Sequence, residues 1–236
     1  VLLSALALGT FNFSATIPDE GMFPLSELSR AGLKKAGLKI SEKDIYNPGQ
    51  IGLVDALVQV SGCTGSFVSR TGLIITNHHC AFSAVQLAST PEHNYLQNGF
   101  VANSHEQEIE AKGLTIRITD SYEDVSKQVL DAVANITDPI QRIDLINKKR
   151  VELAKAAEAA DPTIKAEVSE MFIGKSYVLF KYKTIEDVRL VYIPRQDIGE
   201  FGGETDNWVW PRHTGDFSFL RAYVAPDGKS AKYSKD

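Results

Sequence analysis

Two adjacent histidines and one of the two cysteines of the chain fall together in the stretch LIITNHHCAF, Leu73–Phe82. Imidazole and thiolate groups bind zinc, a cysteine can anchor a disulfide, and a histidine can act as a general base in catalysis. His78, His79 and Cys80 are therefore candidates for a metal site, for a disulfide anchor, or for one arm of a catalytic triad. The choice between these three depends on residues elsewhere in the chain.

Composition and charge limit the class of protein. The chain has 236 residues, of which 43% are hydrophobic, so it can bury one large core or two small ones. The formal net charge is −5, and the sequence shows no basic stripe, which argues against a nucleic-acid partner. No apolar run reaches the roughly 18 residues of a membrane span, so no transmembrane helix is predicted.

The chain begins with an apolar stretch, VLLSALALGTFNFSA, that is followed by polar residues. This pattern favours the hydrophobic part of a signal peptide over a buried first strand. We therefore expect residues 1–15 to be the remnant of a signal peptide, which makes the chain a fragment at its start. Export to the periplasm or out of the cell would allow the two cysteines to be oxidised.

The order of the predicted elements is mostly β with one helical region. Strand-like patterns cover residues 51–76, 114–118 and 164–193, and return after residue 215. Between these strands, apolar residues from Val125 onwards repeat at helical spacing, and Asp138-Pro139 reads as the N-cap and first turn of a second helix. The sequence predicts a mostly β domain interrupted by a helical hairpin at about residues 121–161.

The stretch Cys63–Cys80 has the order cysteine, hairpin, strand and Thr-x-x-His-Cys. It resembles the first β-barrel of the chymotrypsin-like serine peptidases, in which two cysteines clamp the hairpin and the histidine beside the second one is the general base. The resemblance implies a disulfide between Cys63 and Cys80 and a base at His79, not at His78. The motif alone leaves open a structural histidine near the end of a strand.

A triad base needs a carboxylate that fixes its tautomer and stabilises the imidazolium formed during attack. In chymotrypsin-like enzymes this aspartate begins a strand of the form Asp-apolar-Ser/Thr-apolar-Leu-basic, and Asp216–Arg221, DFSFLR, has that form. The resemblance therefore implies that Asp216 is the partner of His79. The helical hairpin accounts for part of the long separation between the two residues.

Five stretches carry a more specific resemblance, in the order EGMF, GCTGSFVSRTGLIITNHHC, HNYLQNGF, DVRLVYIP and FGGETDNWVWPRHTGDFS. They resemble the bacterial dipeptidyl-peptidase 7 and dipeptidyl-peptidase 11 family, and the similarity runs from about residue 19 to the last residue. The resemblance implies the first part of a chymotrypsin-like double β-barrel, at residues 16–236. It also implies release of dipeptides from the free N-terminus of oligopeptides, and a homodimer. We expect no cofactor and no metal.

The same resemblance assigns roles to single residues. It implies that His79 and Asp216 are catalytic, and that Asn207, with Trp208 nearby, holds the free α-amino group of the substrate. An amide oxygen can accept a hydrogen bond from an ammonium group, and an aromatic face can add a cation–π attraction. On the residues alone, Asn207 reads as a turn residue and Trp208 as a core residue.

A serine peptidase also needs a nucleophile and an oxyanion hole. The chain contains no Gly-x-Ser-Gly or Gly-x-Ser-x-Gly motif, and in the family both features lie in a second barrel further along. We therefore expect this chain to hold two members of a triad and to be inactive alone. The alternatives are a peptide-binding relative without a nucleophile, and a metal-binding module that uses His78 and Cys80. The latter is disfavoured because those two residues supply only two ligands.

Overall fold

The computed structural model describes residues 25–47, 49–199 and 214–234, and the chain divides into two compact units, residues 1–53 and 54–236. The predicted remnant of a signal peptide and the predicted amine-binding residues, Asn207 and Trp208, lie outside the described residues.

The described residues of the first unit form two short helices, the 3-10 helix η1 (Leu25–Ala31) and the α-helix α1 (Glu42–Ile45). A reciprocal cap starts α1, because the Ser41 side chain accepts from the backbone N–H of Lys43 and the Asp44 carboxylate accepts from that of Ser41. A second 3-10 helix, η2 (Leu53–Ala56), begins at the boundary between the two units.

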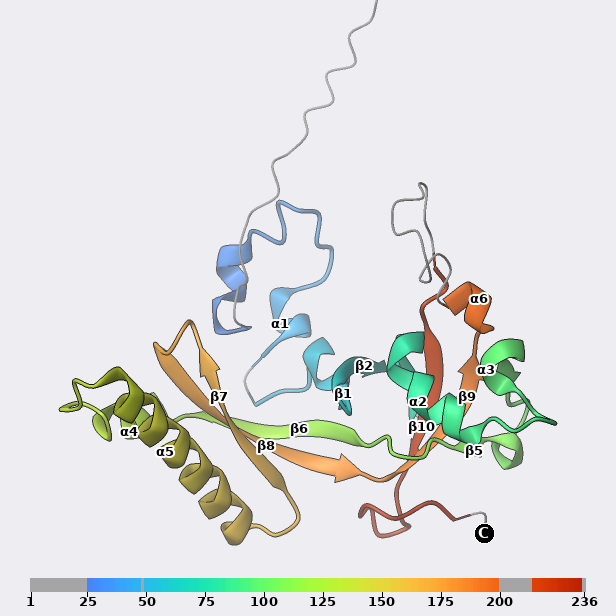
Figure 1. The fold of residues 1–236 in the computed structure, drawn as a ribbon. Helices are drawn as coiled ribbons and strands as arrows, with labels where there is room; N and C mark the ends of the chain where they lie inside the picture. Colours follow the sequence, from blue (N-terminus) through green and yellow to red (C-terminus); the bar gives the residue numbers. More distant parts are fainter. Residues whose placement is uncertain (1–24, 48, 200–213, 235–236) are drawn as a thin grey trace, which may run out of the picture. The chain divides into compact units, whose positions relative to one another are not determined.

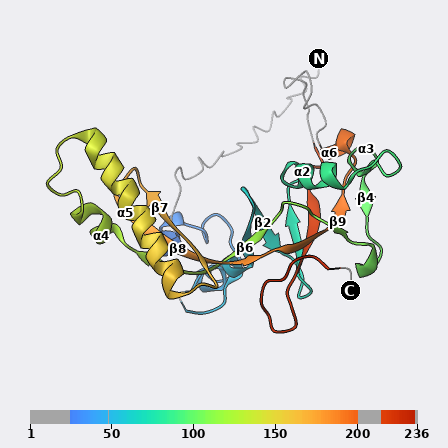
Figure 2. The ribbon, with the colours of Figure 1, turned by 60° about the horizontal axis from the view of Figure 1, so that its bottom comes forward.

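A ten-stranded antiparallel sheet forms the body of the second unit (Figures 1 and 2). Its order is β4-β9-β10-β3-β2-β1-β6-β8-β7, and β5 also pairs with β9. The strands are β1 (Leu57–Val60), β2 (Cys63–Phe67), β3 (Leu73–Thr76), β4 (Phe100–Val101), β5 (Ile109–Glu110), β6 (Ile116–Asp124), β7 (Lys165–Met171), β8 (Ser176–Ile185), β9 (Asp187–Ile193) and β10 (Ser218–Tyr223). The helices of this unit are α2 (His78–Ala88), α3 (Tyr95–Asn98), η3 (His105–Gln107), α4 (Ser126–Asp131), α5 (Pro139–Ala160) and α6 (Gln196–Gly199).

The turn between β2 and β3 is the predicted hairpin, and it depends on Gly72. This glycine has a φ of +76°, which favours a residue without a Cβ. A Cβ built there would also lie 2.5 Å from the carbonyl oxygen of Ala222, just after the part of β10 that pairs with β3. The glycine therefore permits both the turn and the close approach of β10.

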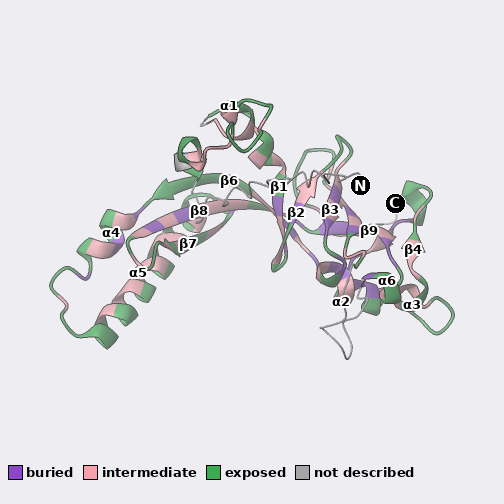
Figure 3. Cartoon of the chain, turned by 90° about the horizontal axis from the view of Figure 1, so that it is seen from above, coloured by how far each residue is buried: buried purple, intermediate pink, exposed green. Residues whose placement is uncertain are grey.

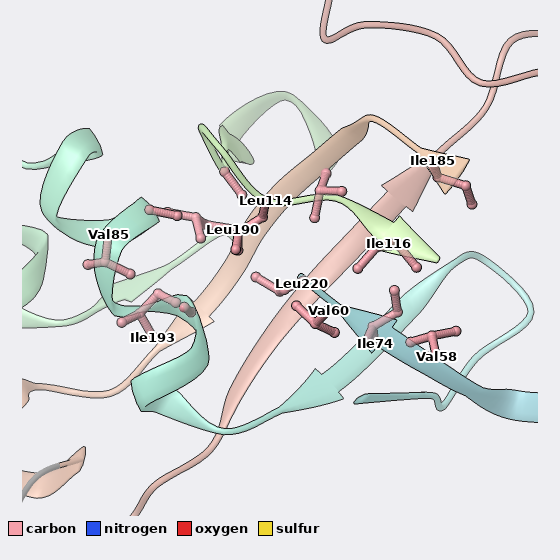
Figure 4. Packing of buried hydrophobic residues seen from close by; sticks show 14 residues of the cluster. Val58, Val60, Ile74, Val85, Leu114, Ile116, Ile185, Leu190, Ile193 and Leu220 are labelled. Atoms are coloured by element: carbon pink, nitrogen blue, oxygen red, sulfur yellow. The ribbon is translucent and has the colours of Figure 1, made fainter. Parts of the chain in front are cut away.

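The main core lies where β1, β3, β6, β9 and β10 turn their apolar side chains towards one another and towards α2. Ile74 and Leu220 are cross-strand partners in the β3–β10 pair, and both are fully buried. Figure 4 shows their side chains among those of the neighbouring strands, and Figure 3 shows buried residues concentrated on these elements. The buried members are Val58, Val60, Ile74, Ala81, Ala84, Val85, Ala111, Leu114, Ile116, Ile185, Val188, Leu190, Ile193 and Leu220.

The far end of β10 is held by a buried ionic group. The carboxylate of Glu108 accepts from Arg221 Nε at 2.8 Å and from the Tyr223 hydroxyl at 2.7 Å. Arg221 also donates to the carbonyl oxygen of Thr71 in the β2–β3 turn. Desolvation, reinforced by the bond to Glu108, raises the pKa of Tyr223 to about 12, so this hydroxyl stays a donor at neutral pH. The cluster ties β10 to β3 at the end opposite Asp216.

The helical region starts later than predicted. Residues 121–124 belong to β6, which continues to Asp124 because it stays paired with β8 beyond an irregularity between Thr119 and Ser121. The helices then occupy residues 126–131 and 139–160, and Asp138 caps α5 by accepting from the backbone N–H of Gln141. Helix α5 packs against β7, and a second small core forms from Val125, Val129, Val168, Tyr177 and Leu179.

The observed architecture confirms the predicted fold class, mostly β with a helical insertion. Within the described part of the chain, no helix has both the length and the apolar composition that crossing a membrane requires.

Truncating Ile74 should destabilise the chain. Its side chain is fully buried between neighbouring strands, and losing an isoleucine to alanine in such a site costs about 2–5 kcal/mol. The matched control is Leu87→Ala on α2, where the residue is 64% exposed and the expected change stays within about 0.5 kcal/mol. Urea unfolding followed by circular dichroism measures both, and equal midpoints for the two variants would contradict this packing.

Candidate active site

The two adjacent histidines lie in the first turn of a helix, not at the end of a strand. Strand β3 ends at Thr76, Asn77 is the N-cap, and α2 starts at His78. Successive residues of an α-helix point roughly 100° apart, so the neighbours have different surroundings. His78 is fully buried, whereas the His79 side chain is 62% exposed. Only His79 is therefore open to a reacting group.

His79 and Asp216 are brought together, as predicted, by two hydrogen bonds. The Nδ1 atom of the His79 ring lies 2.7 Å from Asp216 Oδ2, and the backbone N–H of His79 donates to Oδ1 at 3.0 Å. The carboxylate thus contacts both the ring and the backbone N–H of the same residue. This double contact fixes the direction of the imidazole.

Asn77 is a third member of this arrangement that the sequence did not reveal. Its amide nitrogen donates to Asp216 Oδ2 and to the Asp216 carbonyl oxygen, each at 3.1 Å. An asparagine directly before a helix reads as an ordinary N-cap. Here the side chain makes no capping bond and is committed to Asp216 instead. The sequence shows an asparagine directly before the helix, but it does not show that the side chain bonds to Asp216.

The ionisation of Asp216 follows from these contacts. Burial by itself would raise its pKa, but the hydrogen bonds from the His79 backbone and ring, the charge of His79 and the Asn77 amide together hold the pKa below the ordinary value. An ionised carboxylate can only accept hydrogen bonds, so Nδ1 of His79 carries the proton. The Nε2 atom of the neutral ring then has the free lone pair that a general base needs.

The β3–β10 pair sets the spacing of the two residues. Ser218 lies opposite Thr76 in this pair, which places Asp216, two residues earlier, beside the start of α2. The segment before β10 is fixed as well, because the backbone N–H of Gly215 donates to the carbonyl of Ile198 in α6 at 2.9 Å. A one-residue shift of β10 relative to β3, or of Gly215 relative to Ile198, would separate the carboxylate from the ring.

The structure contains the predicted disulfide between Cys63, at the start of β2, and Cys80, in the first turn of α2. The Cα atoms are 6.0 Å apart. The bridge joins the hairpin to the helix that carries His79, so it fixes the first turn of α2 against the sheet. A crosslink around a loop of this size stabilises a fold by about 3 kcal/mol in the chain-entropy model.

His78 packs beneath α6. A Cβ at Gly199 would lie 2.7 Å from Cγ of the His78 ring, so the last residue of α6 can only be a glycine if the ring keeps its place. His78 also meets Phe82 edge to face, with ring centroids 6.2 Å apart. These contacts give His78 a packing role.

The alternative interpretation is a metal site that uses His78 and Cys80. The group of possible metal ligands that the structure brings together contains His79 in place of His78. Among the described residues, Cys63, His79 and Cys80 are the set whose ligand atoms lie within 4.8 Å of one another. Both sulfur atoms of this set are consumed by the disulfide.

Comparison with known proteins identifies the family. Residues 18–236 match the model of peptidase family S46. The chain belongs to this family. It is 42% identical over 227 residues to the Asp/Glu-specific dipeptidyl-peptidase of Porphyromonas gingivalis, covering 92% of this chain and 31% of that protein. It is 38% identical over 240 residues to dipeptidyl-peptidase 7 of Porphyromonas endodontalis, covering 100% of this chain and 29% of that protein.

The fold agrees with solved structures of S46 relatives. The crystal structure of Porphyromonas endodontalis DPP11 in complex with substrate superposes with a TM-score of 0.80 at 38% identity, covering 92% of this chain and 33% of that one. The predicted resemblance to dipeptidyl-peptidases 7 and 11, and with it the chymotrypsin-like fold, is confirmed. This chain spans about a third of the length of these relatives. The share is 31% of the P. gingivalis enzyme, 29% of dipeptidyl-peptidase 7 and 33% of the DPP11 chain in the crystal structure.

The lowered pKa of Asp216 predicts a pH-dependent part of the stability. A carboxyl with a depressed folded pKa stabilises the fold above its unfolded value of about 3.9, and this contribution is lost as the pH falls through the folded pKa. Asp216→Asn should therefore lower the free energy of unfolding at about pH 6, and its deficit should shrink towards about pH 3. Urea titrations of both chains across this range test it, and a deficit that is the same at every pH would contradict it.

Proposed function

We propose that this chain supplies the general base and its carboxylate to a serine-type dipeptidyl-peptidase that releases dipeptides from the free N-terminus of oligopeptides. The observation that carries the proposal is the 2.7 Å contact between His79 Nδ1 and Asp216 Oδ2, which leaves Nε2 as the acceptor on an exposed ring. Membership of peptidase family S46, with relatives named as dipeptidyl-peptidases, supports the proposed reaction class.

In the proposed mechanism, Nε2 of His79 takes the proton of a serine hydroxyl as its oxygen attacks the substrate carbonyl. Asp216 stays ionised and stabilises the imidazolium that forms. His79 then gives that proton to the leaving amine, and in the second half-reaction it activates water in the same way. The nucleophile and the oxyanion hole belong, in this proposal, to a second barrel outside this chain.

Binding of the substrate's amino terminus is assigned to Asn207 and Trp208. A dipeptidyl-peptidase must measure two residues from a free amino group, and it can do so by satisfying the ammonium with an oxygen acceptor inside a closed end of the cleft. The stretch TDNW that contains both residues is part of the family resemblance. The described residues on either side of this segment, Ile198 and Gly215, are bonded to each other next to Asp216.

The protein is further proposed to be exported to the periplasm or secreted, and to act as a homodimer. The apolar first residues support export, and the disulfide is consistent with an oxidising compartment. The dimer rests on the family resemblance alone.

Replacing His79 by alanine or Asp216 by asparagine, in a polypeptide that also carries the second barrel, should each abolish nearly all peptidase activity. The aspartate change should act by favouring the wrong tautomer and removing imidazolium stabilisation, with a loss of about 10⁴-fold in kcat. His93→Ala, an exposed histidine outside the site, is the matched control and should stay near the unaltered activity. Activity that survives His79→Ala would rule out His79 as the base.

The 236-residue chain by itself should show no peptidase activity, because its base has no nucleophile to activate. Purified chain is incubated with dipeptidyl substrates and with a serine-directed covalent inhibitor. Turnover that the inhibitor blocks would place the nucleophile inside this chain and contradict the division of the triad.

Asn207→Ala should lower kcat/KM for a substrate with a free amino terminus by about 10- to 150-fold. A hydrogen bond to a charged group contributes roughly 1.5–3 kcal/mol, and the variant leaves the ammonium without its acceptor. The N-acetylated form of the same substrate has no ammonium, so it should be a poor substrate and nearly insensitive to the substitution. Equal losses on both substrates would show that Asn207 shapes the loop without touching the amine.

A further inference from the structure

The disulfide and the exposed histidine form a compact set of zinc-type ligands. Cys63 comes from the start of β2, while His79 and Cys80 are the second and third residues of α2. One ligand atom from each lies within 4.8 Å of the other two. Tetrahedral zinc, with bonds of about 2.3 Å to sulfur and about 2.0 Å to nitrogen, needs ligand atoms about 3.5–3.8 Å apart. Once the sulfurs are separate, the ligand atoms therefore lie within about 1 Å of the spacing that zinc needs.

Both sulfur ligands lie where a reductant and an ion can reach them. Cys80 lies in the first turn of an eleven-residue helix, where the backbone N–H groups favour negative charge. Both cysteines are partly exposed. The Cα atoms are 6.0 Å apart, and Cys63 lies in β2 while Cys80 lies in α2, two elements that also contribute residues to the main core.

Asp216 gives the histidine ligand its orientation. It already holds Nδ1 of His79 at 2.7 Å, which leaves Nε2 as the nitrogen that can bind an ion without breaking that bond. A carboxylate behind a metal-bound histidine is the usual outer contact of zinc sites, where it fixes the ring and raises its basicity. Asn77, bonded to the same carboxylate, steadies it in turn.

We propose that reduction of the Cys63–Cys80 disulfide creates a zinc site made of Cys63, Cys80 and His79, and that zinc bound there inhibits the enzyme. A dithiol transfers two electrons and two protons to the disulfide and is itself oxidised to a disulfide. Zinc then displaces the two thiol protons and takes the lone pair of His79 Nε2. That lone pair is the one which would accept the serine proton, so the inhibitory part rests on the proposed function.

Zinc binding is tested on the chain itself, without turnover. The chain, reduced by a water-soluble phosphine, is titrated with Zn²⁺ against a chromogenic chelator, and Co²⁺ replaces zinc to show thiolate-to-cobalt absorption. The reduced chain should bind one ion and the oxidised chain none. Absence of binding after reduction, or equal binding by the oxidised chain, overturns the proposal.

Variants separate this site from binding to scattered cysteines. His79→Ala and Cys63→Ser should each weaken zinc binding strongly, and His93→Ala should leave it unchanged. Asp216→Asn should weaken it by about 10- to 100-fold, because an outer contact acts only in the folded site. Zinc affinity that does not respond to His79→Ala or to Asp216→Asn would mean that the site does not form.

Inhibition is tested in the polypeptide that carries the second barrel. Zinc should inhibit only the reduced enzyme, and a chelator should restore activity, whereas the double variant Cys63→Ser/Cys80→Ser should not respond to zinc. Zinc that binds the reduced enzyme without inhibiting it overturns the inhibitory part. An enzyme without peptidase activity in any state would overturn the proposed function, while zinc binding to the chain would still stand.

Discussion

The hydrogen bond from His79 Nδ1 to the Asp216 carboxylate is the interaction on which the candidate active site depends, because it leaves Nε2 of the neutral ring with a free lone pair. It joins His79, the second residue of the helix that follows β3, to Asp216, two residues before β10, so it exists only if those two strands pair in one register. The hydrophobic core shared by β3 and β10, and the Glu108–Arg221 pair at their far end, maintain that register. Packing and electrostatics far from the ring therefore set the direction of its Nε2 atom.

The same carboxylate also explains why the pair suits base catalysis. Three donors, two from His79 and one from Asn77, keep Asp216 ionised although it is only a quarter exposed. A neutral carboxyl could not fix the tautomer or stabilise a neighbouring imidazolium. The exposed face of the ring remains open, which is what the proposed proton transfer from a serine hydroxyl requires. The adjacent disulfide holds the helix turn on which this geometry depends.

Several elements of the fold could be predicted from the sequence, because at those places the local sequence pattern and the tertiary structure agree. The β2–β3 hairpin follows from its Gly72 turn, α5 follows from its Asp138-Pro139 start, and the cysteine spacing follows the family pattern. The extension of β6 to Asp124 could not be read from the sequence, because it results from pairing with β8, more than fifty residues later. Likewise, local rules assign Asn77 to helix capping, and only its contact with Asp216 shows its actual partner. The choice of His79 over His78 as the base stays a prediction, and the structure adds a physical difference between the two, because His78 is buried against Gly199 while His79 is exposed.

The tautomer of His79 is the most direct test of this arrangement, and it needs neither substrate nor nucleophile. Nitrogen-15 NMR of the imidazole, in chain labelled at histidine and held at a pH where the ring is neutral, distinguishes a protonated Nδ1 from a protonated Nε2. If Asp216 holds the ring as the structure shows, the proton lies on Nδ1, and Asp216→Asn moves the population towards Nε2. A proton on Nε2 in the unaltered chain, or a tautomer ratio that ignores the substitution, would contradict the assignment of His79 as the base.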